Sequence, residues 1–248
     1  KFIQTGGAVA NAGNFSIENS FTQSEAGVIA VGGNIGLTQA TGNLNTSNLS
    51  GNHIHLTANN GAVVLGTVNA RGVLTVNATG HITQSTNSTV KSNGGSHLAS
   101  SSGDIVLPNL GNDQDGIITA SAANITLTDA SNPIFVLNAT GNSALIAGGN
   151  LTVSGVTSNL TTTSQNGTTS FGVTTIHGDL STRSSGSVSQ TSPVTVRGSA
   201  SIDTKGNDLT TILVDNAIPV PVTAPVTAPV GLLPVLQTRL LRQPSAGS

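Results

Sequence analysis

The acidic residues best placed for metal binding lie in the segment GNDQDGIIT, residues 111–119. Asp113 and Asp115 take the places of the oxygen ligands at positions 3 and 5 of a calcium loop whose sixth residue is Gly. Positions 1 and 12 of that loop would be Gly111 and Ala122, which offer no side-chain oxygen. Asp113 and Asp115 are therefore candidate calcium ligands, and an ordinary Asp/Gly turn is the alternative.

Two histidines stand two residues apart in the sequence HIHL, so His53 and His55 would share one face of a strand. Imidazole binds metals, but no third ligand is adjacent in the sequence, and outward, solvated histidines are the alternative. The sequence contains no His-Glu-x-x-His, phosphate-loop or nucleophile-elbow motif. We expect no cofactor and no catalytic residue.

Carboxylate chemistry on sugars is the main enzymatic alternative, because glycoside hydrolysis uses two carboxyl groups roughly 5 to 10 Å apart. The chain has 10 acidic residues, among which Asp203 and Asp208 flank a turn. Sugar-processing clefts usually offer aromatic surfaces, and the chain has no Trp or Tyr. We expect no enzymatic activity, with a polysaccharide-binding or polysaccharide-degrading protein as the alternative.

The composition limits the elements that could position these groups. Charged residues make up 7% of the 248 residues and aromatic residues 2%, against about 25% charged residues in a typical domain. The chain is instead rich in Ser, Thr, Asn, Gly, Val, Ile and Leu, which is typical of an all-β protein. No run reaches the ~18 apolar residues of a transmembrane helix, and we predict no transmembrane segment. The formal charge of −2 and the scattered cations argue against nucleic-acid binding.

A loose repeat predicts the fold. The sequence VLTVNATGHITQS, residues 73–85, consists of an apolar-x-apolar run, a polar bend and a second such run, and similar segments recur about every 20 to 25 residues. Short alternating strands bury enough apolar surface only if successive coils stack. We predict a parallel β-helix over residues 1–214, with nine or ten coils roughly 45 Å long at ~4.8 Å per coil. Its bends fall at Gly80, Gly103 and Gly141, and an antiparallel β-sandwich is the alternative.

The strings LTVNATGHITQ, HLTANNGAVVLGTVNARG and SSSGDIVL resemble the repeats of filamentous haemagglutinin-like proteins, bacterial exoproteins secreted by the two-partner route. The resemblance covers roughly residues 14–214. It implies a right-handed β-helix, export across an outer membrane, and a role as an adhesin or surface fibre. The Asn-Pro-Asn motifs of that family's secretion domain are missing, and Asn132-Pro133-Ile134 does not match them.

The last segment, residues 215–248, holds six of the nine prolines and two copies of Val-Thr-Ala-Pro. Proline cannot donate to a strand ladder, so we predict an extended tail. Its Val and Leu residues could cover the end of the β-helix or dock on a neighbouring subunit; a flexible linker is the alternative. Open β-helix ends also expose strand edges that join other chains.

Together these patterns predict an extracellular or cell-surface, secreted structural and adhesive protein. We expect it to self-associate head to tail into surface or matrix fibres through its ends and its C-terminal tail. Its surface rich in hydroxyl and amide groups would contact other surfaces or glycans. The absence of Cys fits export, because a chain without thiols forms no wrong disulfides in an oxidising compartment.

Overall fold

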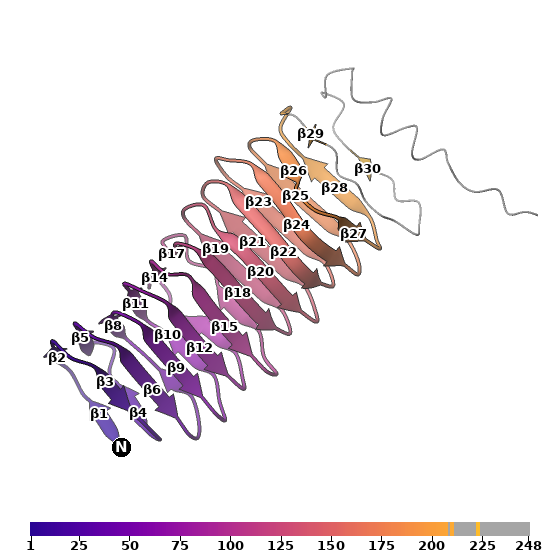
Figure 1. The fold of residues 1–248 in the computed structure, drawn as a ribbon. Coiled ribbons are helices and arrows are strands. Elements are labelled where there is room, and N and C mark those ends of the chain that lie inside the picture. Colours follow the sequence, from indigo (N-terminus) through magenta and orange to yellow (C-terminus); the bar gives the residue numbers. More distant parts are fainter. Residues whose placement is uncertain (208, 211–221, 224–248) are drawn as a thin grey trace, which may run out of the picture.

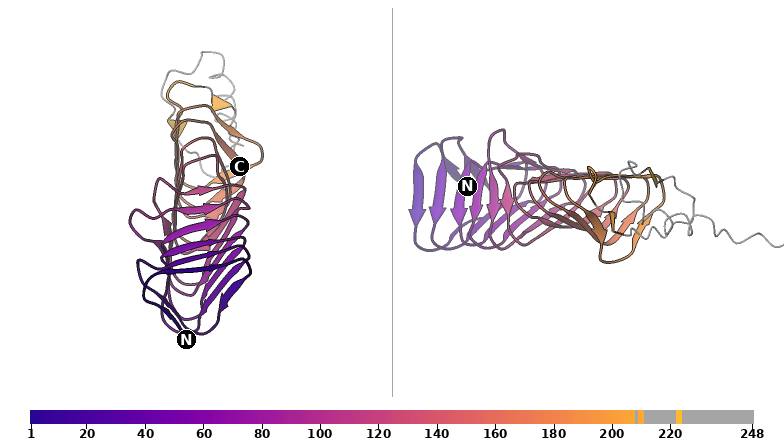
Figure 2. Two further views of the ribbon diagram at one scale, coloured as in Figure 1. Left: turned by 90° about the vertical axis from the view of Figure 1, so that its left-hand side faces the viewer. Right: turned by 90° about the horizontal axis from the view of Figure 1, so that it is seen from above.

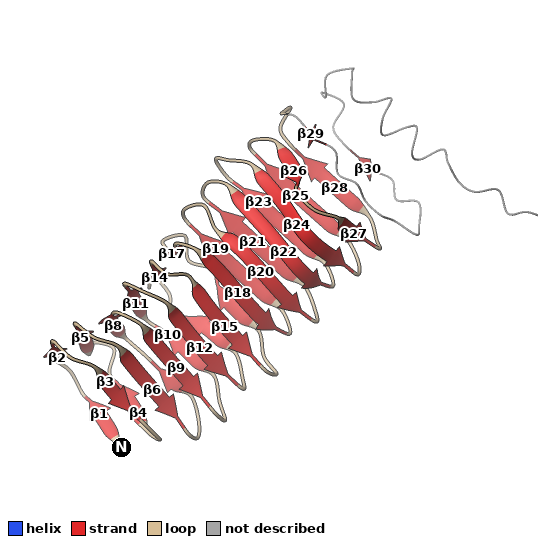
Figure 3. Cartoon of the chain, in the orientation of Figure 1, coloured by secondary structure: helices blue, strands red, loops and turns tan. Residues whose placement is uncertain are grey.

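The computed structural model describes residues 1–207, 209–210 and 222–223, and these residues form an elongated stack of coils (Figure 1). Every strand pairing in this part of the chain is parallel. The described residues contain strands, turns and bends and no helix (Figure 3). The predicted parallel β-solenoid is therefore confirmed, and the antiparallel sandwich is wrong. The handedness stays a prediction.

Three sheets run along the stack, and we name them by size. The long sheet has 12 strands: β3 (Phe15–Ile17), β6 (Ile35–Gln39), β9 (Ile54–Ala58), β12 (Leu74–Ala78), β15 (Ser96–Ser100), β18 (Ile117–Ala122), β20 (Ile134–Ala139), β22 (Leu151–Thr157), β24 (Thr169–Ile176), β26 (Val188–Gln190), β27 (Val194–Val196) and β29 (Leu209–Thr210). Its successive rungs show about 11 turns of the solenoid, slightly more than predicted.

The ten-stranded sheet lies beside it in each coil and consists of β7 (Leu44–Asn45), β10 (Val63–Leu65), β13 (Ile82–Gln84), β16 (Ile105–Leu107), β19 (Ile125–Asp129), β21 (Ser143–Ala147), β23 (Leu160–Ser164), β25 (Leu180–Ser184), β28 (Ala200–Asp203) and β30 (Val222–Thr223). The short sheet has six strands: β2 (Ala8–Asn11), β5 (Val28–Val31), β8 (Asn48–Gly51), β11 (Thr67–Ala70), β14 (Val90–Ser92) and β17 (Asp113–Gln114). Near the N-terminus, β1 (Phe2–Gln4) pairs with β4 (Phe21–Gln23).

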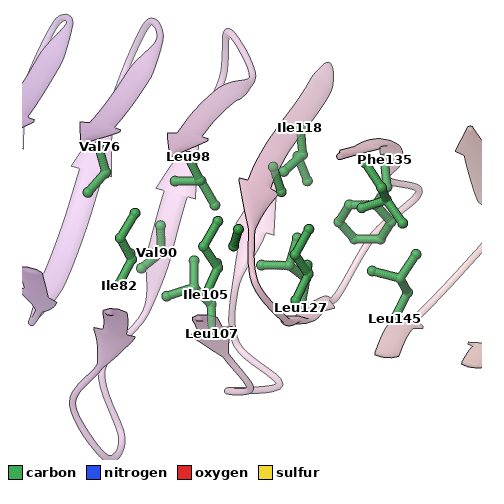
Figure 4. Packing of buried hydrophobic residues seen from close by; sticks show 14 of the residues in the cluster. Val76, Ile82, Val90, Leu98, Ile105, Leu107, Ile118, Leu127, Phe135 and Leu145 are labelled. Atoms are coloured by element: carbon green, nitrogen blue, oxygen red, sulfur yellow. The ribbon is translucent and has the colours of Figure 1, made fainter. Parts of the chain in front are cut away.

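The core is a column of aliphatic side chains between the sheets (Figure 4). Val76 on β12 pairs in register with Leu56 and Leu98 on the neighbouring rungs, and all three are buried. Thr75 between these inward positions is only half-buried, as the period-two pattern predicts. Burial of each Leu or Val side chain contributes about 1.5 to 3 kcal/mol to the stability of the fold. Because each coil adds such side chains, this contribution is repeated along the axis.

The coil changes its cross-section midway along the molecule. Coils up to β17 have strands in three sheets, while the described coils beyond it have strands in two sheets. At this point the register offset of the long sheet falls: Ser96 pairs with Ile118, 22 residues on, whereas Ile118 pairs with Phe135, 17 residues on. The sequence repeat predicted two strands per coil, so it missed the short sheet. Figure 2 shows the stack of coils from two further sides.

The predicted bend glycines lie at the corner between the long and ten-stranded sheets, but not because they need a left-handed conformation. Gly80, Gly103 and Gly141 all lack a positive φ. A Cβ on Gly103 would lie 2.5 Å from the backbone N of His81 on the previous coil. Close approach of successive corners therefore favours glycine at this position.

The core of the long sheet also holds two aromatic rings. Phe135 and Phe171 are fully buried in the long sheet, two rungs apart, with Val153 in register between them. The smaller side chain between the rings leaves space for both.

The predicted tail, residues 215–248, lies outside the described residues apart from Val222 and Thr223, where β30 pairs with β28. No helix in the described residues is long and apolar enough to cross a membrane.

Candidate functional site

The candidate calcium residues lie at the last strand of the short sheet. Asp113 is partly exposed on β17, and its carboxylate lies 3.9 Å from the Lys91 ammonium on β14. Asp115 is exposed just after the strand, and its backbone N–H donates to Ser92. Within the described ranges no three His, Cys, Asp or Glu side chains gather as a metal site. Calcium binding by Asp113 and Asp115 stays a prediction.

The acid with the most unusual environment is one that the sequence did not single out. Asp129 ends β19, is 1% exposed, and lies over the edge of β17. Its Oδ2 accepts the backbone N–H of Gln114 at 2.7 Å, and its Oδ1 accepts the backbone N–H and the hydroxyl of Ser131. The backbone N–H of Ala130 donates to Asn112 at 2.7 Å. Asp129 and its turn thus provide hydrogen-bond partners for backbone groups at the edge of β17, where the short sheet ends.

Burial raises the pKa of the Asp129 carboxyl above its ordinary value. The hydrogen bonds from Ser131 and Gln114 oppose this shift, and the nearby Asp113 carboxylate adds slightly to it. Close to it, the Oε1 atom of Gln114 is buried without a hydrogen-bond partner. A polar junction therefore lies where the coil narrows from three sheets to two.

The histidines do not form the strand-face pair that the sequence predicted. His53 lies at the corner before β9, where its Nδ1 accepts the backbone N–H of Val73 at 3.0 Å. His55 projects from the outer face of β9, with its Nε2 3.1 Å from the Thr57 hydroxyl. The prediction that His53 and His55 share a strand face is wrong, because the strand begins only at Ile54.

A ladder of side chains links successive coils at the corner before the ten-stranded sheet. Each side chain accepts a hydrogen bond from the equivalent residue one coil further along. The accepting residues are His81, Asp104, Asn124, Asn142, Asn159 and Asp179, and we call them the corner ladder. Five of the six bonds come from a backbone N–H, and the bond to Asn142 comes from the Asn159 side-chain amide. The corner ladder therefore satisfies backbone groups that the strand ladders leave free.

The corner ladder has a sequence signal that composition alone did not reveal. An Asn, Asp or His follows a Gly and precedes the first apolar residue of a strand in GHI (80–82), GDI (103–105) and GDL (178–180). The same triplet pattern occurs at the opposite corner in GNI, residues 33–35, where the Asn34 side chain accepts the N–H of His53 at 3.1 Å. These polar residues hold the stack together rather than forming a pocket.

The first described coil forms one end of the stack. Phe2, Val9, Phe15 and Ile17 of this coil pack against the core and are partly buried. The ring of Phe2 stacks on Phe21 at 5.7 Å and meets Phe15 edge-on at 5.4 Å between centroids. Each of β1, β2 and β3 has one neighbouring strand in its sheet. Three strand edges and an apolar end therefore face the same direction (Figure 1).

These features define a parallel β-solenoid whose corner side chains bond coil to coil. The chain belongs to the family described as repeats of unknown function (DUF5649), whose model matches residues 50–121 and 157–224. No curated protein and no solved structure matches the chain. The first matched range lies mostly in the three-sheet part and the second in the two-sheet part, so the repeat accommodates both cross-sections. The resemblance to filamentous haemagglutinin in particular stays a prediction.

Proposed function

We propose that this chain is a non-enzymatic, exported scaffold that assembles end to end on a cell surface or in an extracellular matrix and has an adhesive role there. The proposal is supported by the continuous core, the corner ladder and the outer faces rich in hydroxyl and amide groups. The resemblance to filamentous haemagglutinin-like repeats supports the extracellular location.

The strand edges of the first described coil are the observation that carries the proposal. In a parallel ladder, alternate residues of a strand bond to the same neighbour. Gly7 and Asn11 accept hydrogen bonds from β5 and its flank, so Ala8 and Ala10 direct their N–H and C=O groups away from β5. Unpaired strand edges of this kind pair with strands of another chain. Partial exposure of Phe2 and Phe15 adds a hydrophobic contribution to such a contact.

Electron microscopy of the full chain tests the proposal, with Ala10→Pro as the blocking variant. Proline removes the free N–H at the edge of β2 and spares the hydrogen bonds to β5. We expect filaments or short end-to-end rows from the native chain and fewer or none from Ala10→Pro. Ala10→Val is the matched control, since it keeps the N–H and suits a strand. Circular dichroism verifies that both variants fold.

The proposal fails if the native chain remains a dispersed monomer at high concentration, or if Ala10→Pro and Ala10→Val assemble equally. Activity of the native chain on polysaccharides would overturn the non-enzymatic part of the proposal. Localisation is tested separately, by detecting the protein in the medium or on intact cells with an antibody.

A further inference from the structure

The outer face of the long sheet carries an unusual set of exposed aliphatic side chains. Six large hydrophobic residues are exposed among the described residues, and four of them lie on consecutive rungs of this sheet. We call these four, together with the half-buried Val136, the aliphatic stripe. Its members are Ile117 on β18, Ile134 and Val136 on β20, Val156 on β22 and Val173 on β24. Their exposure contrasts with the polar outer positions of β9 and β12.

The backbone brings the stripe together on one surface. Ile117 pairs directly with Ile134, and Ile134 and Val136 lie two residues apart on the same face. The next member, Val156, lies on β22. The last member, Val173 on β24, is exposed next to a register shift between Val153 and Gly155. A β-bulge of this kind changes the direction in which the side chains of the strand point. The stripe therefore extends over four consecutive rungs of the long sheet, β18, β20, β22 and β24, whose ribbons lie side by side in Figure 1.

The whole sheet around the stripe is uncharged. None of its 12 strands contains Asp, Glu, Lys or Arg, whereas the short sheet has Lys91 and Asp113, and the ten-stranded sheet has Arg183 and Asp203. Depletion of charge and exposed aliphatic residues are the signature of an interface core rather than of a solvated surface. A face without charge can also stack on a copy of itself with no like-charge contact.

The size of this face fits a dimer. Nine successive rungs run from β6 to the β26/β27 pair, with both ends counted. They extend over about 43 Å at ~4.8 Å per rung. Strands of about five residues give a width of about 17 Å at ~3.3 Å per residue. The footprint is about 730 Å² per copy, or about 1,500 Å² for two copies, which lies within the range of about 1,200–2,000 Å² for stable interfaces.

We propose that two copies of this chain pair laterally, face to face, through the outer face of the long sheet, with the aliphatic stripe at the centre of the contact. Sheets stacked in this way lie about 10 Å apart with interdigitated side chains. A single extended peptide is a poorer occupant, because peptides add to sheet edges through backbone hydrogen bonds. This pairing is independent of the proposed end-to-end assembly and would join two solenoids side by side.

Sedimentation equilibrium of the full chain tests the pairing, with Ala10→Pro present in every sample to block end contacts. We expect a monomer–dimer equilibrium that Ile134→Lys with Val156→Lys weakens by about a hundredfold or more, because like charges then meet across the contact. Thr161→Lys with Ser201→Lys, on exposed outer positions of the ten-stranded sheet, is the matched control and should leave the dimer unchanged.

A second measurement does not depend on the lysine variants. The native chain has no Cys, so Val156→Cys provides a single thiol on the stripe and Thr161→Cys one on the control face. A short bismaleimide should cross-link the first into dimers and leave the second monomeric. The proposal is overturned by a monomer at all concentrations, or by equal effects on the two faces. It is also overturned if dimers form only after residues 211–248 are removed, since the chain's own C-terminal segment would then occupy the face.

Discussion

Replacing Asp129 tests whether this side chain ends the short sheet. Its carboxylate accepts the backbone N–H of Gln114 and two donors of Ser131. Asp129→Ala removes both acceptor oxygens, and with them all three hydrogen bonds, and leaves the N–H at the edge of β17 without a partner. Gln114 is 1% exposed, so water reaches this N–H only if the corner opens.

The expected cost follows from these contacts. A hydrogen bond to a charged group contributes about 1.5 to 3 kcal/mol, and a buried donor left unpaired costs about 1 to 3 kcal/mol. Ser131 is half-exposed and can bond to water instead. The loss is therefore dominated by the N–H of Gln114, and we expect Asp129→Ala to destabilise this region by about 2 to 4 kcal/mol. Asp104→Ala is the control: it removes an acceptor of a backbone N–H at an exposed corner and should cost about 1 kcal/mol or less.

The raised pKa of Asp129 makes the stability of this region depend on pH. Because ionisation is harder in the folded protein, the folded state holds this proton more tightly than the unfolded state. This contribution to stability is complete below the ordinary pKa of 3.8 and is lost as the pH rises through the higher folded pKa. Asp129→Asn removes this titration. The native chain should therefore lose stability relative to Asp129→Asn by at most about 1.4 kcal/mol per pH unit across that window.

Hydrogen exchange provides the local readout, because a solenoid need not unfold in one step. The peptide covering residues 107–117 should exchange about 30-fold or more faster in Asp129→Ala, since 2 kcal/mol corresponds to about a factor of 30. Urea unfolding at several pH values compares the native chain with Asp129→Asn. Unchanged exchange in this peptide, or a stability difference that does not vary with pH, would refute the role assigned to Asp129.

Three further substitutions test the stacking. Gly66→Ala should destabilise the fold by about 2 kcal/mol or more, because its Cβ would lie 2.0 Å from the backbone oxygen of Ser47; Gly36→Ala, with only ordinary contacts at 3.4 Å, should change thermal stability little. Asn159→Leu should cost about 1 kcal/mol by removing the acceptor for the next coil's N–H, measured as faster exchange near residue 179. Phe171→Ala should cost about 3 to 5 kcal/mol in urea unfolding, and a cost near that of a surface substitution would contradict its placement in the core.

Local alternation predicted the architecture well because it follows from strand geometry. The sequence LTVNATGHITQ places Leu74 and Val76 inward and turns at Gly80 into a second strand, and the structure has β12, a corner and β13 there. The coil length was less accurate, since the register offsets range from 17 to 23 residues. Strands such as β17, with two residues, carry too little pattern to be recognised.

The sequence could not show which polar residues bond to a neighbouring coil, because the role of each one depends on what the next coil places beside it. Asp129 follows an ordinary strand, ITLTD, and only the stacking shows that it lies over the N–H of Gln114. The corner ladder was more accessible, since the triplets GHI and GDI recur at the same place in successive repeats. Asp113 and Asp115 were selected by their spacing, and within the described residues they are not part of a group of three His, Cys, Asp or Glu side chains that could hold a metal.

The change from three sheets to two limits how copies of the chain can meet end to end. The first coil offers the edges of β1, β2 and β3, but the described coils beyond β17 have strands only in the long and ten-stranded sheets. A head-to-tail contact between these coils would pair two sheets directly, and the unpaired N–H and C=O groups of β2 would need a strand partner from outside these two sheets. Such unpaired groups cost stability when they are buried. Head-to-tail filaments should therefore be weaker than a continuous solenoid unless β2 finds a strand partner, and Ala10→Pro, which blocks the edge of β2, should weaken them further.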